Sequence, residues 1–334
     1  MDVPSGLDVD LDRRRVLRLL GGSVGALAGF KAIDNVVLGY GVLVGTNLTE
    51  QDLDAVAGAS FGPQADAVTL DDATLRFDDD TITVESSRGT DTLDATDRER
   101  ARRLDEDHAL DGALVRTVED QRAFAEDAVG FEFSTLEAFF ERTRNGDTRP
   151  ETVERCRGPF FRDVEPATVE RFTEADPADP EATVHGLTDG FRRYADYDVP
   201  RYLAGSVEDN VLFGAADLRA GFEDPVDFES LLAAGETGMF CYEFVWRSME
   251  AFHAVPAREQ TVPVVSAHVF DARHKHVYTA LASVLREDGE LVVPTTFVDY
   301  THTTMYDDFL LRGVMGEGLE AYNTRHRATR IRWY

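Results

Sequence analysis

The sequence predicts an α+β protein in which strands and helices occupy separate stretches of the chain. Residues 67–87 alternate apolar and polar side chains, which predicts short strands with turns at Asp71–Asp72 and Asp78–Asp80. Helical periodicity dominates residues 95–218. Two further apolar runs, 276–285 and 291–299, flank Asp288 and Gly289, a pair that favours a tight hairpin turn. The C-terminal part is therefore expected to contain an antiparallel sheet.

The elements follow one another in a definite order along the chain. A short helix is expected at 49–56, ahead of the strands at 67–87, and pieces of helix at 131–142 and 169–172. Two prolines between Asp176 and Pro180 mark a linker within the helical stretch. We predict an N-terminal segment at 1–47, a mostly helical region with a small β element at 48–219, and a C-terminal domain at 220–334.

The N-terminal segment resembles a twin-arginine export signal. Asp12 to Arg18 contains three consecutive arginines, and the run from Leu19 to Phe30 carries no charge and is rich in Gly and Ala. The chain is accordingly expected to be exported by this route or anchored at a membrane through this segment. The alternative is a buried first helix of a cytoplasmic protein. No cysteine follows the run, which excludes a lipoprotein anchor.

The composition is strongly acidic. The chain has 63 Asp and Glu against 34 Lys and Arg, for a formal charge of -29, and Lys31 and Lys275 are its only lysines. Acidic residues spread over the whole chain are typical of a halophilic protein, because concentrated salt screens their mutual repulsion. A hydrophobic fraction of 43% excludes a disordered polyanion. The absence of a basic patch excludes nucleic acid as a partner.

The chain has two cysteines, Cys156 and Cys241. Two cysteines exclude a disulfide-rich scaffold and a structural zinc site with four cysteine ligands. A single disulfide between them stays open for an exported protein. Cys156 lies between Arg155 and Arg157 and is expected to be a packing residue at a helix end.

Cys241 is predicted to lie in the first turn of a helix. Gly235 and Gly238 oppose helix formation before it, and Phe244, Val245, Met249 and Phe252 follow it at helical spacing. Backbone amides at a helix N-terminus favour a thiolate over a thiol, and they also stabilise an oxyanion. The position is therefore suited to a nucleophilic cysteine.

The predicted hairpin brings a histidine and an aspartate together. A turn centred on Asp288 and Gly289 places His276 opposite Thr301. Asp299, two residues before Thr301, then lies on the same face as His276 and is its diagonal neighbour. A bulge at Pro294 would break this register, because proline cannot donate to a ladder.

These features together resemble the transglutaminase-like superfamily over about eighty residues, roughly 223–303. The resemblance rests on the cysteine at a helix start, the Ala254–Arg258 segment after that helix, and the His276 and Asp299 strands. It implies a papain-like cysteine fold with Cys241 as nucleophile, His276 as general base and Asp299 as the residue that orients the imidazole. The implied function is thiol-dependent acyl transfer, with hydrolysis of a protein or peptide amide preferred to transfer onto an amine. No cofactor or metal is implied.

Two alternatives remain open at this level. One is a non-catalytic domain that keeps the same scaffold for surface or partner binding. The other is a metal hydrolase, in which Asp299 and a set of histidines converge on an ion: His268, His274, His276 and His302. Asp271 and Asp307 are alternatives to Asp299 as the partner of the imidazole.

Overall fold

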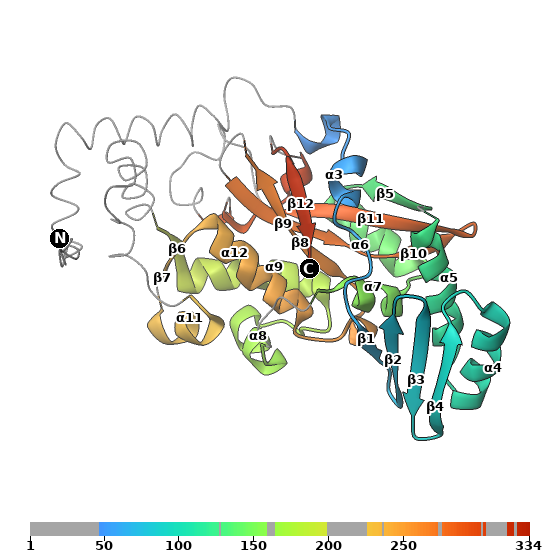
Figure 1. Cartoon of the computed structure of the whole chain (residues 1–334). Helices are drawn as coiled ribbons and strands as arrows, with labels where there is room; N and C mark the ends of the chain where they lie inside the picture. Colours follow the sequence, from blue (N-terminus) through green and yellow to red (C-terminus); the bar gives the residue numbers. More distant parts are fainter. Residues whose placement is uncertain are drawn as a thin grey trace, which may run out of the picture.

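The computed structural model confirms an α+β protein (Figure 1). It describes residues 47–126, 128–158, 164–198, 226–235, 237–272, 276–301, 303–304, 319–323 and 326–334. The predicted export segment at 1–47 lies outside these residues apart from Asn47, and so does the predicted domain boundary at 219. Within the described residues, none of the helices combines the length and the apolar character needed to cross a membrane.

The helices and the strands have the following bounds. The helices are η2 (Leu48–Glu50), α3 (Asp54–Gly58), α4 (Arg98–His108), α5 (Ala113–Ala125), α6 (Leu136–Asn145), α7 (Pro150–Cys156), α8 (Pro166–Thr173), α9 (Pro180–Tyr194), α11 (Phe228–Ala234), α12 (Cys241–His253), η4 (Ala257–Glu259) and η5 (Ala321–Asn323). The strands are β1 (Ala67–Thr69), β2 (Ala73–Asp78), β3 (Thr81–Ser86), β4 (Gly89–Asp94), β5 (Val129–Phe133), β6 (Ala195–Tyr197), β7 (Thr237–Met239), β8 (Val265–Asp271), β9 (His276–Ala282), β10 (Leu285–Glu287), β11 (Glu290–Val298) and β12 (Arg330–Trp333).

Strands β1 to β4 form an antiparallel meander, and α4 and α5 share a core with it. Val68, Leu75, Ile82 and Val84 are fully buried in that core, as their period-two spacing predicts. Figure 1 shows this meander and α4 at one end of the molecule. The strands predicted at 67–87 are thereby confirmed.

The larger sheet has the strand order β10-β11-β9-β8-β12, and β5 pairs in parallel with β11. Its strands bury both faces. Tyr278, Ala280 and Phe297 belong to a core shared with α3 and α7, whereas Leu281 and Val298 belong to a second core shared with α6, α9 and α12. The alternation of side chains along each strand thus divides the sheet between two hydrophobic cores.

The prediction of helix over 131–142 is wrong in its first part. Phe131 and Phe133 belong to β5, where they alternate with Glu132, and they pack against the first of these cores. Helix α6 begins only at Leu136, after Thr135, whose Oγ1 accepts a hydrogen bond from the Ala138 N–H at 3.3 Å. The alternation of aromatic residues in 131–133 is therefore the pattern of a strand. The helical spacing of the residues from Leu136 onward concealed it.

The hairpin has the predicted register. Asp288 and Gly289 both have positive φ, 50° and 90°, as a two-residue hairpin turn requires. The same register extends without a bulge from the Arg286–Leu291 pair to the Thr279–Val298 pair. Pro294 keeps this register: its carbonyl accepts a hydrogen bond from the Ser283 N–H at 3.1 Å. The face assignment of His276 and Asp299 depends on this continuity.

Helices α8 and α9 approach each other at two glycines. A Cβ added at Gly186 would lie 2.5 Å from the carbonyl oxygen of Thr173, and one at Gly190 would lie 2.4 Å from the ring of Phe172. This close approach holds Phe191, whose ring contacts Phe244 of α12 at 5.0 Å between centroids. Phe191 also contacts Tyr300, the residue after Asp299, at 5.3 Å. The contact between α8 and α9 therefore supports both ends of the candidate site.

We expect Gly186→Ala to lower stability although alanine is the better helix former. Helix propensity favours alanine by about 1 kcal/mol. The added methyl group meets backbone, which must move at a cost of about 1–3 kcal/mol. Gly58→Ala in α3 is the matched control, because its Cβ would meet only the Phe131 ring at 3.6 Å. Thermal unfolding should show a lower Tm for Gly186→Ala and an unchanged or higher Tm for Gly58→Ala. A higher Tm for Gly186→Ala would contradict the close approach of α8 and α9.

Candidate active site

Cys241 is the first residue of α12, as predicted. The chain enters the helix from Phe240, which is extended with φ -100° and ψ 165°. The Glu243 carboxylate accepts a hydrogen bond from the Phe240 N–H at 2.6 Å and so closes the first turn. Both cysteines are free thiols, and Cys241 is half-buried whereas Cys156 is buried. Cys156 is a packing residue at the end of α7, as expected, and burial raises its pKa to about 12.

Helix α12 runs alongside β9 in the same direction. Val245 packs with Val277 near the start of the strand, and one turn later the Ser248 and Thr279 hydroxyls are 2.7 Å apart. The start of α12 is therefore brought to the start of β9. His276 is the first residue of that strand, so Cys241 and His276 meet although they are far apart in sequence.

The imidazole of His276 lies between the cysteine and the aspartate. Its Nε2 is 2.7 Å from Oδ2 of Asp299, and its side chain forms a hydrogen bond with Cys241. The other carboxylate oxygen of Asp299 accepts a hydrogen bond from the Thr301 N–H at 2.9 Å. Asp299 is fully buried, so it forms a fixed, charged support for the ring. The structure thus brings together all three predicted site residues.

Of the two alternative acids, the structure describes Asp271, which has another recorded hydrogen bond. Asp271 is the cross-strand partner of His276, but its Oδ2 accepts a hydrogen bond from the Arg327 N–H at 3.2 Å. Asp307 lies outside the described residues. Asp299 is therefore the acid whose hydrogen bond to His276 the structure records.

The site favours a protonated His276. Burial lowers the pKa of His276, but the charge of Asp299, its hydrogen bond, and the contribution of Cys241 outweigh burial and raise the pKa to about 10. The ring is thus an imidazolium near neutral pH, with Nε2–H donating to Asp299. A cationic imidazole beside a sulfur is the environment that stabilises a thiolate.

A second histidine, His326, binds the same carboxylate. Its Nε2 is 2.6 Å from Oδ2 of Asp299, and its ring is fully buried with its edge toward Tyr278, 4.7 Å between centroids. Burial, and to a smaller extent the charge of His276, lower the pKa of His326 against the pull of Asp299. This ring is therefore neutral and donates its Nε2–H to Asp299. The sequence around His326 carries no local pattern that indicates a contact with Asp299, 27 residues earlier.

The same three side chains are the group within the described residues that could hold a metal ion. The ligand atoms of His276, Asp299 and His326 lie within 4.8 Å of one another. His268 is not part of this group, because its ring stacks on Phe270 at 4.3 Å between centroids. His274 and His302 lie outside the described residues. Zinc ligands around one tetrahedral ion are about 3.3 Å apart. The distances of 2.7 and 2.6 Å from the two Nε2 atoms to Oδ2 are instead those of hydrogen bonds.

Comparison of the chain with protein-family models, with curated proteins and with solved structures gives no match. The chemical interpretation of the site therefore rests on its own geometry.

We expect Asp299→Asn to lower the pKa of His276. Asparagine removes the negative charge, so burial is opposed mainly by Cys241. Because the folded pKa of about 10 exceeds the ordinary value of 6.5, protonation of His276 stabilises the fold fully below pH 6.5. That stabilisation is lost as the pH rises from 6.5 through 10. The unfolding free energy of Asp299→Asn should therefore fall less than that of the wild type over this window. Histidine NMR titration measures the pKa directly, and an unchanged value near 10 would contradict the assignment.

We expect His326→Leu to weaken the support of Asp299. Loss of one hydrogen bond to a buried carboxylate should lower the unfolding free energy by about 1–3 kcal/mol. Alkylation of Cys241 should slow as well, because the ring of His276 is then held by a less fixed partner. His326→Gln is the matched control, since its amide N–H can still donate to Asp299. If His326→Leu is as stable and as readily alkylated as the wild type, His326 does not position Asp299.

Proposed function

We propose that the C-terminal part of the chain is a papain-like, transglutaminase-like domain and that it catalyses thiol-dependent acyl transfer to water, hydrolysing a protein or peptide amide. The observation that carries the proposal is the continuous chain of hydrogen bonds from Cys241 through His276 to Asp299. A nucleophile, a base and a group that orients the base are the parts that such a reaction requires. They stand at the start of α12, at the start of β9 and just after the end of β11.

In the first half of the reaction, the Cys241 thiolate attacks the amide carbonyl carbon, and the carbonyl oxygen becomes an oxyanion. Backbone N–H groups in the first turn of α12 supply the hydrogen bonds that stabilise that charge. The imidazolium of His276 then gives its proton to the amine as the C–N bond breaks, which leaves a thioester on Cys241. Acylation removes the sulfur's negative charge, one of the contributions that raise the pKa of His276, and so favours this proton transfer.

In the second half, water attacks the thioester carbonyl and His276 takes a proton from that water. The C–S bond breaks, the acid leaves, and the thiolate–imidazolium pair is restored. Asp299 holds its Nε2–H hydrogen bond throughout, so the ring keeps its other nitrogen toward the sulfur. Transfer to an amine would follow the same steps with the amine in place of water.

A metal-dependent hydrolase is the second candidate, because His276, Asp299 and His326 form a set of two histidines and one carboxylate. An ion at these atoms would displace both Nε2 protons and separate the rings from Oδ2. The thiol mechanism requires no such rearrangement and is therefore preferred. A non-catalytic binding domain is the third candidate, and it requires no reactive thiol.

We expect iodoacetamide, at limiting concentration in high salt, to alkylate Cys241 rapidly between about pH 5 and pH 9. The rate should stay high at the acidic end in the wild type, because His276 remains protonated below a pKa of about 10. In His276→Ala the alkylation rate should fall steeply at pH values below the pKa of an ordinary thiol. Mass spectrometry of the intact protein and its peptides gives the rate at each cysteine.

Cys156 is the internal control, because burial keeps it from the reagent until the protein unfolds. Labelling of Cys241 only after denaturation, or only at alkaline pH regardless of His276, would support the non-catalytic domain. If treatment with EDTA abolishes activity and added Zn²⁺ restores it, while Cys241→Ala remains active, the metal hydrolase replaces the thiol enzyme.

A further inference from the structure

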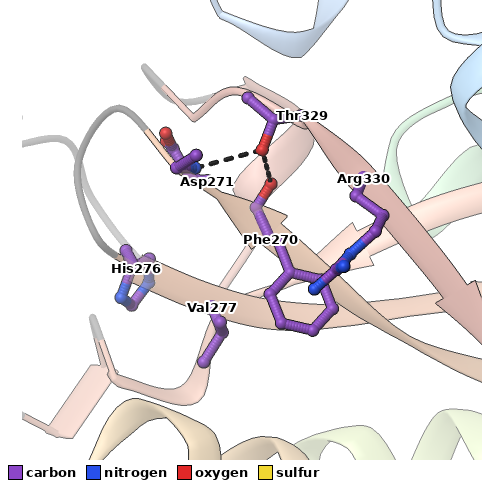
Figure 2. Close-up of a pocket in the computed structure, with 7 residues that line it drawn as sticks. Phe270, Asp271, His276, Val277, Thr329 and Arg330 are labelled. Carbon is purple, nitrogen blue, oxygen red and sulfur yellow. Dashed lines mark hydrogen bonds between the residues drawn. The ribbon is translucent and has the colours of Figure 1, made fainter.

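A pocket of about 450 Å³ adjoins His276 on the side of β9 that faces β8 (Figure 2). It is lined by residues of β8, β9 and the C-terminal segment that pairs with β8: Phe270, Asp271, Ala272, His276, Val277, Thr329 and Arg330. His276 therefore belongs both to the candidate site and to this pocket. A molecule bound here would lie beside His276, the residue from which the leaving group takes its proton.

Among the described residues that line it, the pocket combines an apolar surface with one cation, Arg330. Phe270 and Val277 are cross-strand partners, and Arg330 is the partner of Phe270 on the next strand. All three point to the same side of the strands in Figure 2, and the Arg330 guanidinium lies 4.0 Å from the centre of the Phe270 ring. Thr329 links the strands at the edge of the pocket. Its hydroxyl donates a hydrogen bond to the Phe270 carbonyl at 2.7 Å and accepts one from the Ala272 N–H at 3.1 Å.

Arg330 has no carboxylate partner among the described residues; its recorded contact is the Phe270 ring. An exposed cation without a partner is unexpected in a chain with 63 acidic residues and a net charge of -29. The positive charge of Arg330 also acts on a nearby histidine. Burial, and then the charges of Arg330 and Arg332, lower the pKa of His268 to about 4. A guanidinium supported on an aromatic ring and open to solvent is well suited to bind a carboxylate.

Asp271 is the acid that also lines the pocket, and it does not neutralise Arg330. Strand alternation places its side chain on the face opposite Phe270. There it is buried and accepts a hydrogen bond from the Arg327 N–H. The side of the pocket that carries Phe270, Val277 and Arg330 thus presents apolar surface and positive charge.

We propose that this pocket binds the leaving-group part of the substrate and selects one that carries a carboxylate next to an apolar group. The inference rests on the proposed function, because that function makes His276 the proton donor to the leaving amine. The carboxylate can be the α-carboxylate of a C-terminal residue or the side chain of an acidic residue. Both present the same charge to Arg330.

Binding is tested in Cys241→Ala, so that the result does not depend on the thiol. The probes are N-acetyl-phenylalanine, its neutral amide, and N-acetyl-glutamate α-amide, each titrated at one fixed salt concentration while the Val277 methyl signals are followed by NMR. We expect at least one of the two carboxylates to bind more tightly than the neutral amide. Tighter binding of N-acetyl-phenylalanine identifies a C-terminal carboxylate, and tighter binding of the glutamate amide identifies an acidic side chain.

Arg330→Gln should weaken binding of the preferred carboxylate about three- to fivefold, the range of a partly exposed ion pair, and should leave the neutral amide unchanged. Arg330→Lys keeps the charge and should lose less. Arg332→Gln is the matched control, because Arg332 is also exposed on β12 but does not line the pocket. Equal binding of all three probes, or carboxylate binding that is indifferent to Arg330, overturns the proposal.

The two proposals fail in different ways. A Cys241 that is alkylated in a His276-dependent manner, together with probe binding that does not depend on Arg330, removes the pocket assignment and leaves the thiol enzyme. Arg330-dependent binding together with an unreactive Cys241 overturns the leaving-group role and leaves an anion-binding pocket on a non-catalytic domain.

Discussion

The register of β9 against β11 is the constraint on which the site depends. It is set by the tight turn at Asp288 and Gly289 and runs without a bulge to the far end of both strands. His276 is the first residue of β9, and Asp299 follows the last residue of β11. Both lie on the face that also carries Tyr278 and Phe297. A slip of one residue would move Asp299 to the opposite face and separate it from His276. A turn more than ten residues away thus decides whether the imidazole has an acidic partner.

Asp299 then gives two identical side chains different charge states. His276 and His326 both reach Oδ2, but His276 also contacts Cys241, whereas His326 is fully buried behind it. The first is held as an imidazolium and the second as a neutral donor. A single carboxylate cannot compensate two buried cations equally well, so the ring that also contacts Cys241 retains the proton. The neutral ring is left to fix the carboxylate in place.

The helical layer aligns the part of the site that carries Cys241. Helix α12 follows β9 along the strand, and Phe191 of α9 packs against both Phe244 of α12 and Tyr300, which adjoins Asp299. The position of Phe191 depends in turn on the close contact of α8 and α9 at Gly186 and Gly190. On the side of the sheet that faces α12, the same strand end opens into the pocket with Arg330. The sheet therefore places His276 beside both Cys241 and this pocket.

The sequence by itself determined the local features: the helix that begins at Cys241, the strands around the Asp288–Gly289 turn, their register, and the packing role of Cys156. Each follows from period, turn chemistry or helix breakers within a short stretch of chain. It misassigned β5, because a parallel strand beside β11 is stabilised by a partner more than 150 residues away. Only the tertiary structure decided that His326 shares Asp299 and that Arg330 and His276 line one pocket. Those contacts join segments far apart in the chain, and neither residue carries a local pattern that would have indicated its partner.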